Sequence, residues 1–234
     1  MRARLVTLSG LVLLSLAMPA AAQTPTLDAQ TPPPRRPAAV RAPRAVPVGA
    51  RVFFALDSDT MTASKTFDAI LGSSTLAAYG GGGEVLNIWR RVFVRGALTF
   101  VSKDGTRVQP SGDEFIPIGI PLTVTMRPFE LGGGWRFGKS ERDRVIPYVG
   151  GGLLLVGLKQ KSTVPTETAE STSDSFTGTV LFGGVDLMPA GKFMAGAEVQ
   201  FRSVPNAIGD DTTTSKERNL GGFTLRALVG LRIR

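Results

Sequence analysis

The side chains that could do chemistry in this chain are acidic and basic ones, because it contains no histidine and no cysteine. Hydrolases commonly need a histidine base, and thiol nucleophiles and ordinary zinc sites need cysteine or histidine. Carboxylates could still exchange protons, and three of them fall in strand-like segments, at Glu84, Glu130 and Glu198. We expect a structural role for them, so the sequence predicts a protein that is not an enzyme and has neither cofactor nor metal site.

Arginines occupy the same kind of segment and the same polar faces as these carboxylates. Charges that leave bulk water must be paired or hydrogen-bonded to offset the lost hydration. We therefore expect an interior salt-bridge network, with a proton or ion path as the alternative role. Its predicted members are Arg51, Glu84, Arg95, Glu130, Arg136, Glu198, Arg202 and Arg226.

The element that would position such residues is clearest in the last segment, from Leu220 to Arg234. Its residues alternate in character, and only Leu228 breaks the pattern. A helix cannot produce a period of two, and the length matches the tilted strand of about 9 to 11 residues that crosses a bilayer. The apolar face carries Gly221, Phe223, Leu225, Ala227, Val229, Leu231 and Ile233.

Eight such segments follow one another after Val48, joined by connections that are alternately long and short. This order predicts an all-β fold, an eight-stranded antiparallel up-and-down transmembrane β-barrel with both termini on the side of the short turns. The expected strands are 50–57, 76–86, 91–103, 120–137, 145–161, 175–187, 192–204 and 220–234. The long connections are 58–74, 104–119, 162–174 and 205–219, and the short ones 87–90, 138–144 and 188–191.

The fourth of these strands changes phase along its length. Leu122, Val124 and Met126 share one face, whereas the apolar residues from Phe129 onward fall on the other. Pro128 lies at the change, where a β-bulge would be tolerated.

Aromatic residues are expected to form two girdles where the strands meet the lipid headgroups. The strand directions place four of them near the short turns and four near the long connections. The first group is Trp135, Phe137, Tyr148 and Phe193, and the second is Phe100, Phe176, Phe201 and Phe223.

The polar faces lack the Lys and Glu density of a solvated surface, which favours a polar lumen and an apolar face turned to lipid. Eight strands enclose a space that side chains just fill, so an open porin is not expected. A narrow pore for small solutes and a soluble lipocalin-like binding barrel remain the alternatives. The glycine clusters at 80–83, 132–134 and 150–152 lack the Lys-Ser/Thr of a phosphate-binding loop and indicate close strand packing.

The front of the chain predicts export. Residues 1–22 have the charged, apolar and small-residue order of a cleaved signal peptide, and 23–48 form a Pro/Ala/Arg-rich disordered periplasmic segment. The barrel domain is then 49–234. The net charge of +8 comes without an aromatic-interleaved basic stripe, so we expect no nucleic-acid partner.

The motifs Pro147-Tyr148-Val149-Gly150-Gly151-Gly152 and Pro121-Leu122-Thr123-Val124-Thr125 resemble the OmpA-like and OmpX-like outer-membrane β-barrel domain superfamily. That resemblance implies a monomer in the outer membrane of a Gram-negative bacterium, inserted by the barrel-assembly machinery and surrounded by outer-membrane lipid. Its members serve as envelope anchors, adhesins or proteins of unknown role.

The four long connections are the places where an extracellular ligand or surface partner would bind. The third contains Glu167, Glu170 and Asp174 without a compensating base, and the fourth contains Asp210 and Asp211. Such acidic loops could hold Ca²⁺ or contact a neighbouring cell. They are equally compatible with solvated connections that bind nothing.

Overall fold

The computed structural model describes residues 48–111, 114–138, 143–162, 170–188, 192–207 and 217–233. The predicted signal peptide and nearly all of the predicted Pro-rich segment lie outside these ranges. Glu167, Asp210 and Asp211, which suggested acidic loops, also lie outside them.

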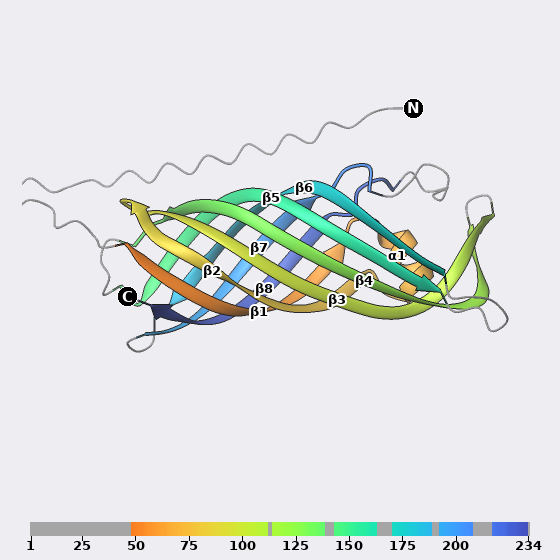
Figure 1. The fold of residues 1–234 in the computed structure, drawn as a ribbon, viewed down its shortest axis with the longest axis horizontal. Helices are drawn as coiled ribbons and strands as arrows, with labels where there is room; N and C mark the ends of the chain where they lie inside the picture. The colour runs from red at the N-terminus through yellow and green to blue at the C-terminus, as the bar shows by residue number, and fades with distance from the viewer. Residues whose placement is uncertain are drawn as a thin grey trace, which may run out of the picture. The chain divides into compact units, whose positions relative to one another are not determined.

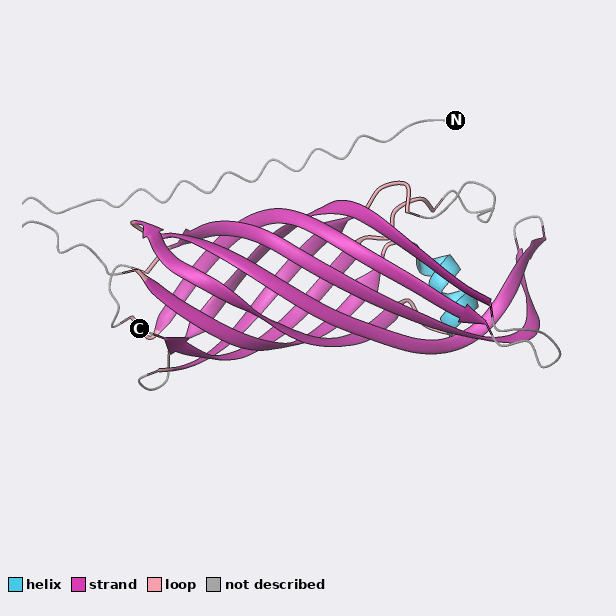
Figure 2. Cartoon of the chain, viewed as in Figure 1, coloured by secondary structure: helices cyan, strands magenta, loops and turns pink. Residues whose placement is uncertain are grey.

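Eight antiparallel strands close into one barrel, in which each strand pairs with its neighbours in sequence and β1 pairs with β8 (Figures 1 and 2). This confirms the predicted eight-stranded up-and-down fold. The strands are β1 (Gly49–Met61), β2 (Thr75–Trp89), β3 (Val92–Ser111), β4 (Glu114–Arg136), β5 (Val145–Ser162), β6 (Glu170–Leu187), β7 (Phe193–Ser203) and β8 (Gly222–Ile233).

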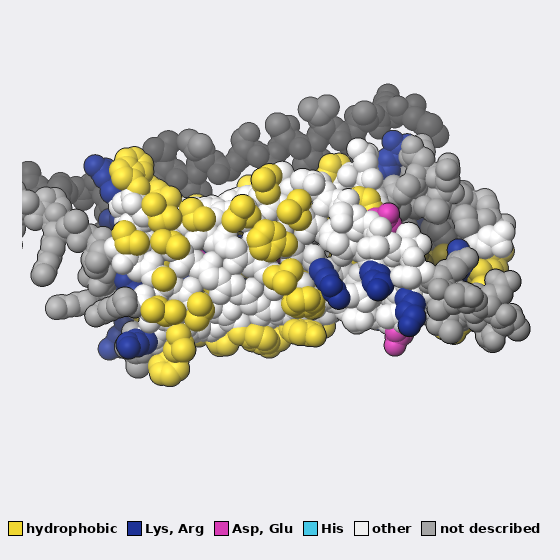
Figure 3. Space-filling model, in the orientation of Figure 1, with side chains coloured by type: hydrophobic (Ala, Val, Ile, Leu, Met, Phe, Trp, Pro, Cys, Tyr) yellow, Lys and Arg dark blue, Asp and Glu magenta, His cyan; other side chains and the backbone are white. Residues whose placement is uncertain are grey.

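Apolar side chains cover a band on the outside of the barrel, because the strands alternate in and out with a period of two (Figure 3). On β8, outward residues run from Phe223 to Ile233, which is ten residue steps. At a rise of about 3.3 Å and a tilt of about 40° this is about 25 Å, the height of the apolar band of outer-membrane barrels.

Several strands are longer than the sequence indicated, at the end of the barrel away from the short turns. β1 continues to Met61, and β3 and β4 extend through most of the predicted connection 104–119. The connection 58–74 also contains a helix that was not predicted, α1 (Ser64–Leu71). Among the described residues, no helix is both long and apolar enough to cross a bilayer.

No β-bulge occurs at Pro128, where the sequence would have tolerated one, because the register with both β3 and β5 is unchanged across it. Pro128 pairs with Val156, and the pairs on both sides keep the same register. The apolar pattern changes phase because the apolar side chains of β4 are on the inner face before Pro128 and on the outer face after it. No residue is inserted in the strand. A register shift does occur further along, between Thr106 and Val108 on β3.

Glycines let the wall approach large inward side chains at several places, of which Gly184 on β6 is a clear case. A Cβ at Gly184 would lie 2.5 Å from the carbonyl oxygen of Ala197 and 2.7 Å from the hydroxyl of Tyr148. The preceding Gly183 points to the outside, where a Cβ would meet nothing nearer than the carbonyl oxygen of Tyr148 at 3.6 Å.

We expect Gly184→Ala to lower the free energy of unfolding by about 1–3 kcal/mol, because the backbone of β7 must move to admit the methyl group. Gly183→Ala is the matched control one residue away and should change it by less than about 0.5 kcal/mol. Urea titration of the protein folded into vesicles measures both. Equal effects of the two substitutions would contradict the close approach at Gly184.

Candidate functional site: the charged lumen and its apolar cap

The lumen holds a large set of ionised side chains that are shielded from water. Within the described residues, five arginines and six carboxylates are buried, and none exposes more than 7 % of its surface. Every one of them lies on a strand, so the strand alternation positions the whole set. The arginines are Arg51, Arg95, Arg136, Arg202 and Arg226, and the carboxylates Asp57, Asp59, Glu84, Glu130, Asp186 and Glu198.

The layer nearer the short turns joins strands on opposite sides of the barrel. Arg51 on β1 lies 2.6 Å from Glu84 on β2 and 2.6 Å from Asp186 on β6. Arg136 on β4 contacts the same Asp186 oxygen at 2.7 Å. The contact between Arg51 and Glu84 is a close ion pair without hydrogen-bond alignment. Among these four residues two cations face two anions, and Arg232, opposite Arg51 in the register of β1 and β8, adds a third cation beside them.

The second layer is centred on Glu130 of β4. Arg226 donates to both Glu130 oxygens, at 2.9 and 3.0 Å, and Arg202 donates to one of them at 2.8 Å. Arg226 also donates two hydrogen bonds to Asp57, at 2.8 and 2.7 Å. Arg226 and Asp57 are directly opposite each other on the neighbouring strands β8 and β1, whereas the hydrogen bonds from Arg202 and Arg226 to Glu130 on β4 run across the lumen.

Glu198 on β7 links this layer to an aromatic cluster. Arg95 donates to Glu198 at 2.5 Å, and the hydroxyl of Tyr148 donates to the same carboxylate oxygen at 2.8 Å. The guanidinium carbon of Arg95 lies 3.7 Å from the centre of the Phe182 ring. Phe93 packs edge-on to Tyr148, with ring centres 5.9 Å apart. A cation held between a carboxylate and a ring face is stabilised on both sides.

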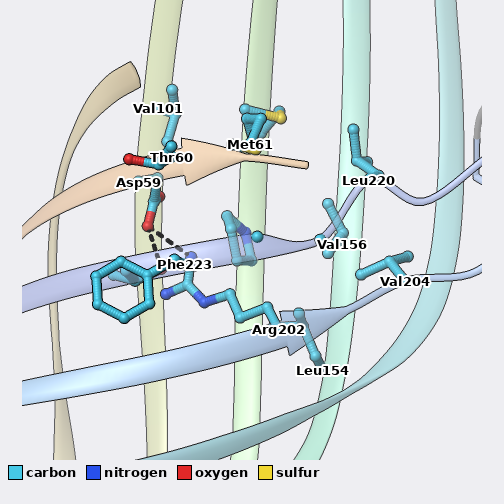
Figure 4. Close-up of a pocket in the computed structure, with 15 residues that line it drawn as sticks. Asp59, Thr60, Met61, Val101, Leu154, Val156, Arg202, Val204, Leu220 and Phe223 are labelled. Atoms are coloured by element: carbon cyan, nitrogen blue, oxygen red, sulfur yellow. Dashed lines mark hydrogen bonds and ion pairs between the residues drawn. The ribbon is translucent and has the colours of Figure 1, made fainter. Parts of the chain in front are cut away.

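Above Asp59 the lumen becomes apolar. Asp59 accepts hydrogen bonds from Arg202 at 3.0 Å and from the Thr224 hydroxyl at 2.5 Å, and its second oxygen has no hydrogen-bond partner. Figure 4 shows Asp59 and Arg202 beside inward apolar side chains. The small cavity between them, about 20 Å³, has room for about one water molecule.

We call the inward apolar residues beyond this point the apolar cap. Helix α1 closes it, since Phe67 and Leu71 are buried in the same cluster. The residues of the cap are Met61, Ala63, Phe67, Leu71, Leu76, Ala78, Val101, Leu122, Val124, Met126, Leu154, Val156, Val204, Ala207 and Leu220.

Glu217, from the connection before β8, holds the first turn of α1. Its carboxylate accepts hydrogen bonds from the backbone amides of Lys65 and Thr66, at 3.2 and 3.0 Å, and from the Thr66 hydroxyl at 2.8 Å. Ala63 at the N-cap has no side chain that could accept these amide protons. An anion is favourable at this end of a helix, so Glu217 replaces the missing cap.

All the residues proposed from the sequence for the charge network face the lumen, and each contacts an opposite charge. The sequence reasoning missed Asp57, Asp59 and Asp186. The first two were assigned to the end of the first strand and the following loop, although they alternate with outward residues in phase with Arg51. Asp186 lies within the predicted strand 175–187, in phase with the inward Phe182.

The aromatic residues do not all lie where the sequence placed them. Phe137, Phe193, Phe201 and Phe223 are exposed on the outside, whereas Trp135 and Phe100 are half-buried. Tyr148 was wrongly assigned to a girdle, because it is inside the lumen and only 3 % exposed. The assignment of Phe176 is also wrong, since it pairs with the inward Val156 and packs against the apolar cap. Exposed Tyr79 and Trp89 were not predicted.

No group of three His, Cys, Asp or Glu residues in the described ranges is arranged to hold a metal ion.

No protein-family model matches the chain, and no curated protein matches its sequence. Solved structures do match in fold. Ail, the attachment invasion locus protein of Yersinia pestis, in complex with the heparin analogue sucrose octasulfate, is 13 % identical with a TM-score of 0.48, over 80 % of this chain and 97 % of that one. The N-terminal β-barrel domain of Pseudomonas aeruginosa OprF is 14 % identical with a TM-score of 0.37, over 78 % and 97 %.

A major outer membrane protein from Thermus thermophilus is 9 % identical with a TM-score of 0.45, over 79 % of this chain and 98 % of that one. At such identities and TM-scores, these likenesses carry no function over to this chain. Its function has to be argued from its own side chains.

Replacing Arg226 by methionine should lower the free energy of unfolding by about 3–5 kcal/mol, because Asp57 and Glu130 would keep their charges in the lumen without their main partner. Arg144→Met, which removes an exposed guanidinium just before β5, is the control and should cost about 0.5 kcal/mol or less. Urea titration in vesicles gives both values. A loss for Arg226→Met as small as that of the control would argue against a stabilising network.

Proposed function

We propose that this protein is an integral barrel of the outer membrane of a Gram-negative bacterium, with a structural or surface-interaction role and a lumen that does not conduct. In this proposal the termini of the barrel domain are periplasmic and the long connections external. Insertion would depend on the barrel-assembly machinery, and the barrel would act as a monomer.

The observation that carries the proposal is an exchange of polarity along the wall. Where the outside is apolar, the inside holds the charge network together with two small apolar clusters. Beyond Pro128 the inside is apolar, while the outside carries Thr, Ser and Lys side chains. β4 contains both arrangements, with Glu130 inside in the first part and Met126 inside in the second. Hydrocarbon around the first part and water around the second account for this exchange.

A soluble lipocalin-like barrel is disfavoured by the same observation. Such a barrel keeps its apolar side chains inside along its whole length and shows polar ones to water. Here Phe54, Leu56, Leu153, Leu181 and Val229 are all exposed on the outside, among many others. An apolar surface of that extent needs lipid or a partner to cover it.

A narrow pore is disfavoured by the filling of the lumen. A solute would have to pass two layers of paired charges and then the apolar cap, which α1 closes. Water and ions leave apolar constrictions readily, so the cap alone would block conduction. The interaction role would then belong to the external connections. The described residues do not identify a ligand for them.

The first test is extraction. We expect the processed protein to stay with membranes in alkaline carbonate and to run faster on a gel before heating than after it, because a closed barrel resists detergent until boiled. A soluble aqueous fraction containing the protein without any detergent would refute membrane integration.

The second test is conductance in planar bilayers. Wild type should show no stable large conductance, and Glu130→Ala should also stay closed because it opens only the charged layer. Adding Leu122→Ser and Val124→Ser to Glu130→Ala should raise the frequency of channel opening, because serine hydroxyls at these two positions allow water to enter the apolar cap. A stable large wild-type conductance would rule out the plugged lumen and support the pore.

A further inference from the structure

A group of cations lies on the outer face of β4 and β5, directly beyond the apolar band. We call Arg127, Lys159 and Lys161 the basic patch. The register places all three outside, because Arg127 pairs with Gly157, Lys159 with Thr125 and Lys161 with Thr123, one residue out of phase with inward Val124 and Met126. All three are exposed. Figure 3 shows Lys and Arg side chains gathered beyond the hydrophobic band.

The charges of the basic patch are not neutralised within the protein. Among the described residues, neither Lys159 nor Lys161 forms an ion pair, and Arg127 contacts only an aromatic ring. The outward carboxylate of the neighbouring β3, Asp104, accepts a hydrogen bond from the Thr123 hydroxyl at 2.7 Å. Hydroxyls of Thr125 and Ser173 flank Lys159 on the adjacent strands. The surface therefore offers three positive charges and the hydroxyls of Thr125 and Ser173, with the Asp104 carboxylate two strands away from the lysines.

Aromatic residues beside Arg127 indicate the height of the basic patch. The guanidinium carbon of Arg127 lies 6.0 Å from the centre of the Phe100 ring, and Phe100 lies 6.1 Å from Tyr79, both on the outside. From the Arg127–Gly157 pair toward the short turns, the next outward residues are Phe129 and Leu155, which are exposed and apolar. In a membrane, aromatic residues mark the interface. Arg127 lies beside Phe100, and Lys159 and Lys161 lie one and two outward positions further along β5 than Gly157, so the three cations lie at and just beyond the level of lipid headgroups.

Resting on the proposed membrane location, we infer that the basic patch binds the phosphate of a phosphorylated lipid headgroup in the leaflet on the side of the long connections. Arg binds phosphate through two parallel hydrogen bonds, and Lys binds it as a point charge. Lys159 and Lys161 are two residues apart on one face, about 6.6–7 Å, so both can reach one headgroup. The basic patch lies at the edge of the apolar band, where lipid headgroups would surround it. These headgroups would keep a large soluble polyanion from reaching the patch, so a lipid is the favoured ligand.

The test is titration of the full-length protein in uncharged detergent micelles with a short-chain phosphatidic acid, with bound lipid counted by native mass spectrometry. Each Lys or Arg near an anionic lipid contributes about fivefold in affinity, so Lys159→Gln should weaken binding about fivefold and the triple Gln variant of the basic patch about a hundredfold. Binding should also weaken as salt rises.

The control is Arg90→Gln, Arg91→Gln and Lys192→Gln together, which removes the same number of charges beside the short turns. It should bind phosphatidic acid like wild type. Heat-dependent gel mobility shows separately whether each variant forms a barrel, so failure of the lipid site is distinguished from failure of the proposed membrane barrel. If the triple variant does not fold, Lys159→Gln alone decides.

Two results would overturn the inference. One is equal binding by wild type and a folded basic-patch variant, or an equal loss in the control, since the cations on β4 and β5 would then not be specific. The other is full displacement of the lipid by inorganic phosphate at the same concentration, which would make the patch a site for the free ion and not for a lipid.

Discussion

The structure depends on the pairing of charges across a closed ring. A lone ionised group inside the barrel would lose several kcal/mol of hydration, and only an opposite charge with good geometry offsets that loss. The lumen of this barrel satisfies the condition with contacts between strands far apart in sequence, such as Arg226 on β8 with Glu130 on β4. These pairs form only when all eight strands have the right order and register. The network therefore contributes to the choice of one closed arrangement as well as to filling the lumen.

The apolar cap follows from the same condition. In the proposed membrane barrel, the wall beyond the hydrocarbon layer would be in water, so its outer face can carry Lys159 and Thr125 while the inner face is an apolar core. Pro128 lies where the faces exchange character. The register is the same on both sides of it, so the change needs no inserted residue.

Much of the fold could be predicted from the sequence because strand alternation is a local property. The eight strands, their order and the facing charges at Glu130 and Arg226 all follow from it. Tyr148 and Phe176 could not be placed correctly, because an aromatic residue suits a lipid interface and an interior equally well. Neighbouring glycines and the Glu198 carboxylate decide for Tyr148, and these lie on other strands. The helix α1 was not predicted, although its buried residues Phe67 and Leu71 have helical spacing. The anion at its first turn, Glu217, lies about 150 residues away in the sequence.

The hydrogen bonds of Glu217 to α1 have a consequence for the order of assembly. The helix follows β1 and Glu217 precedes β8, and these two strands are the free edges of the sheet until they meet. The amides of Lys65 and Thr66 can therefore donate to Glu217 only after β1 and β8 have paired. Docking of α1 is then a late event in assembly. In any precursor in which β1 and β8 have not yet paired, α1 does not cover the end of the barrel.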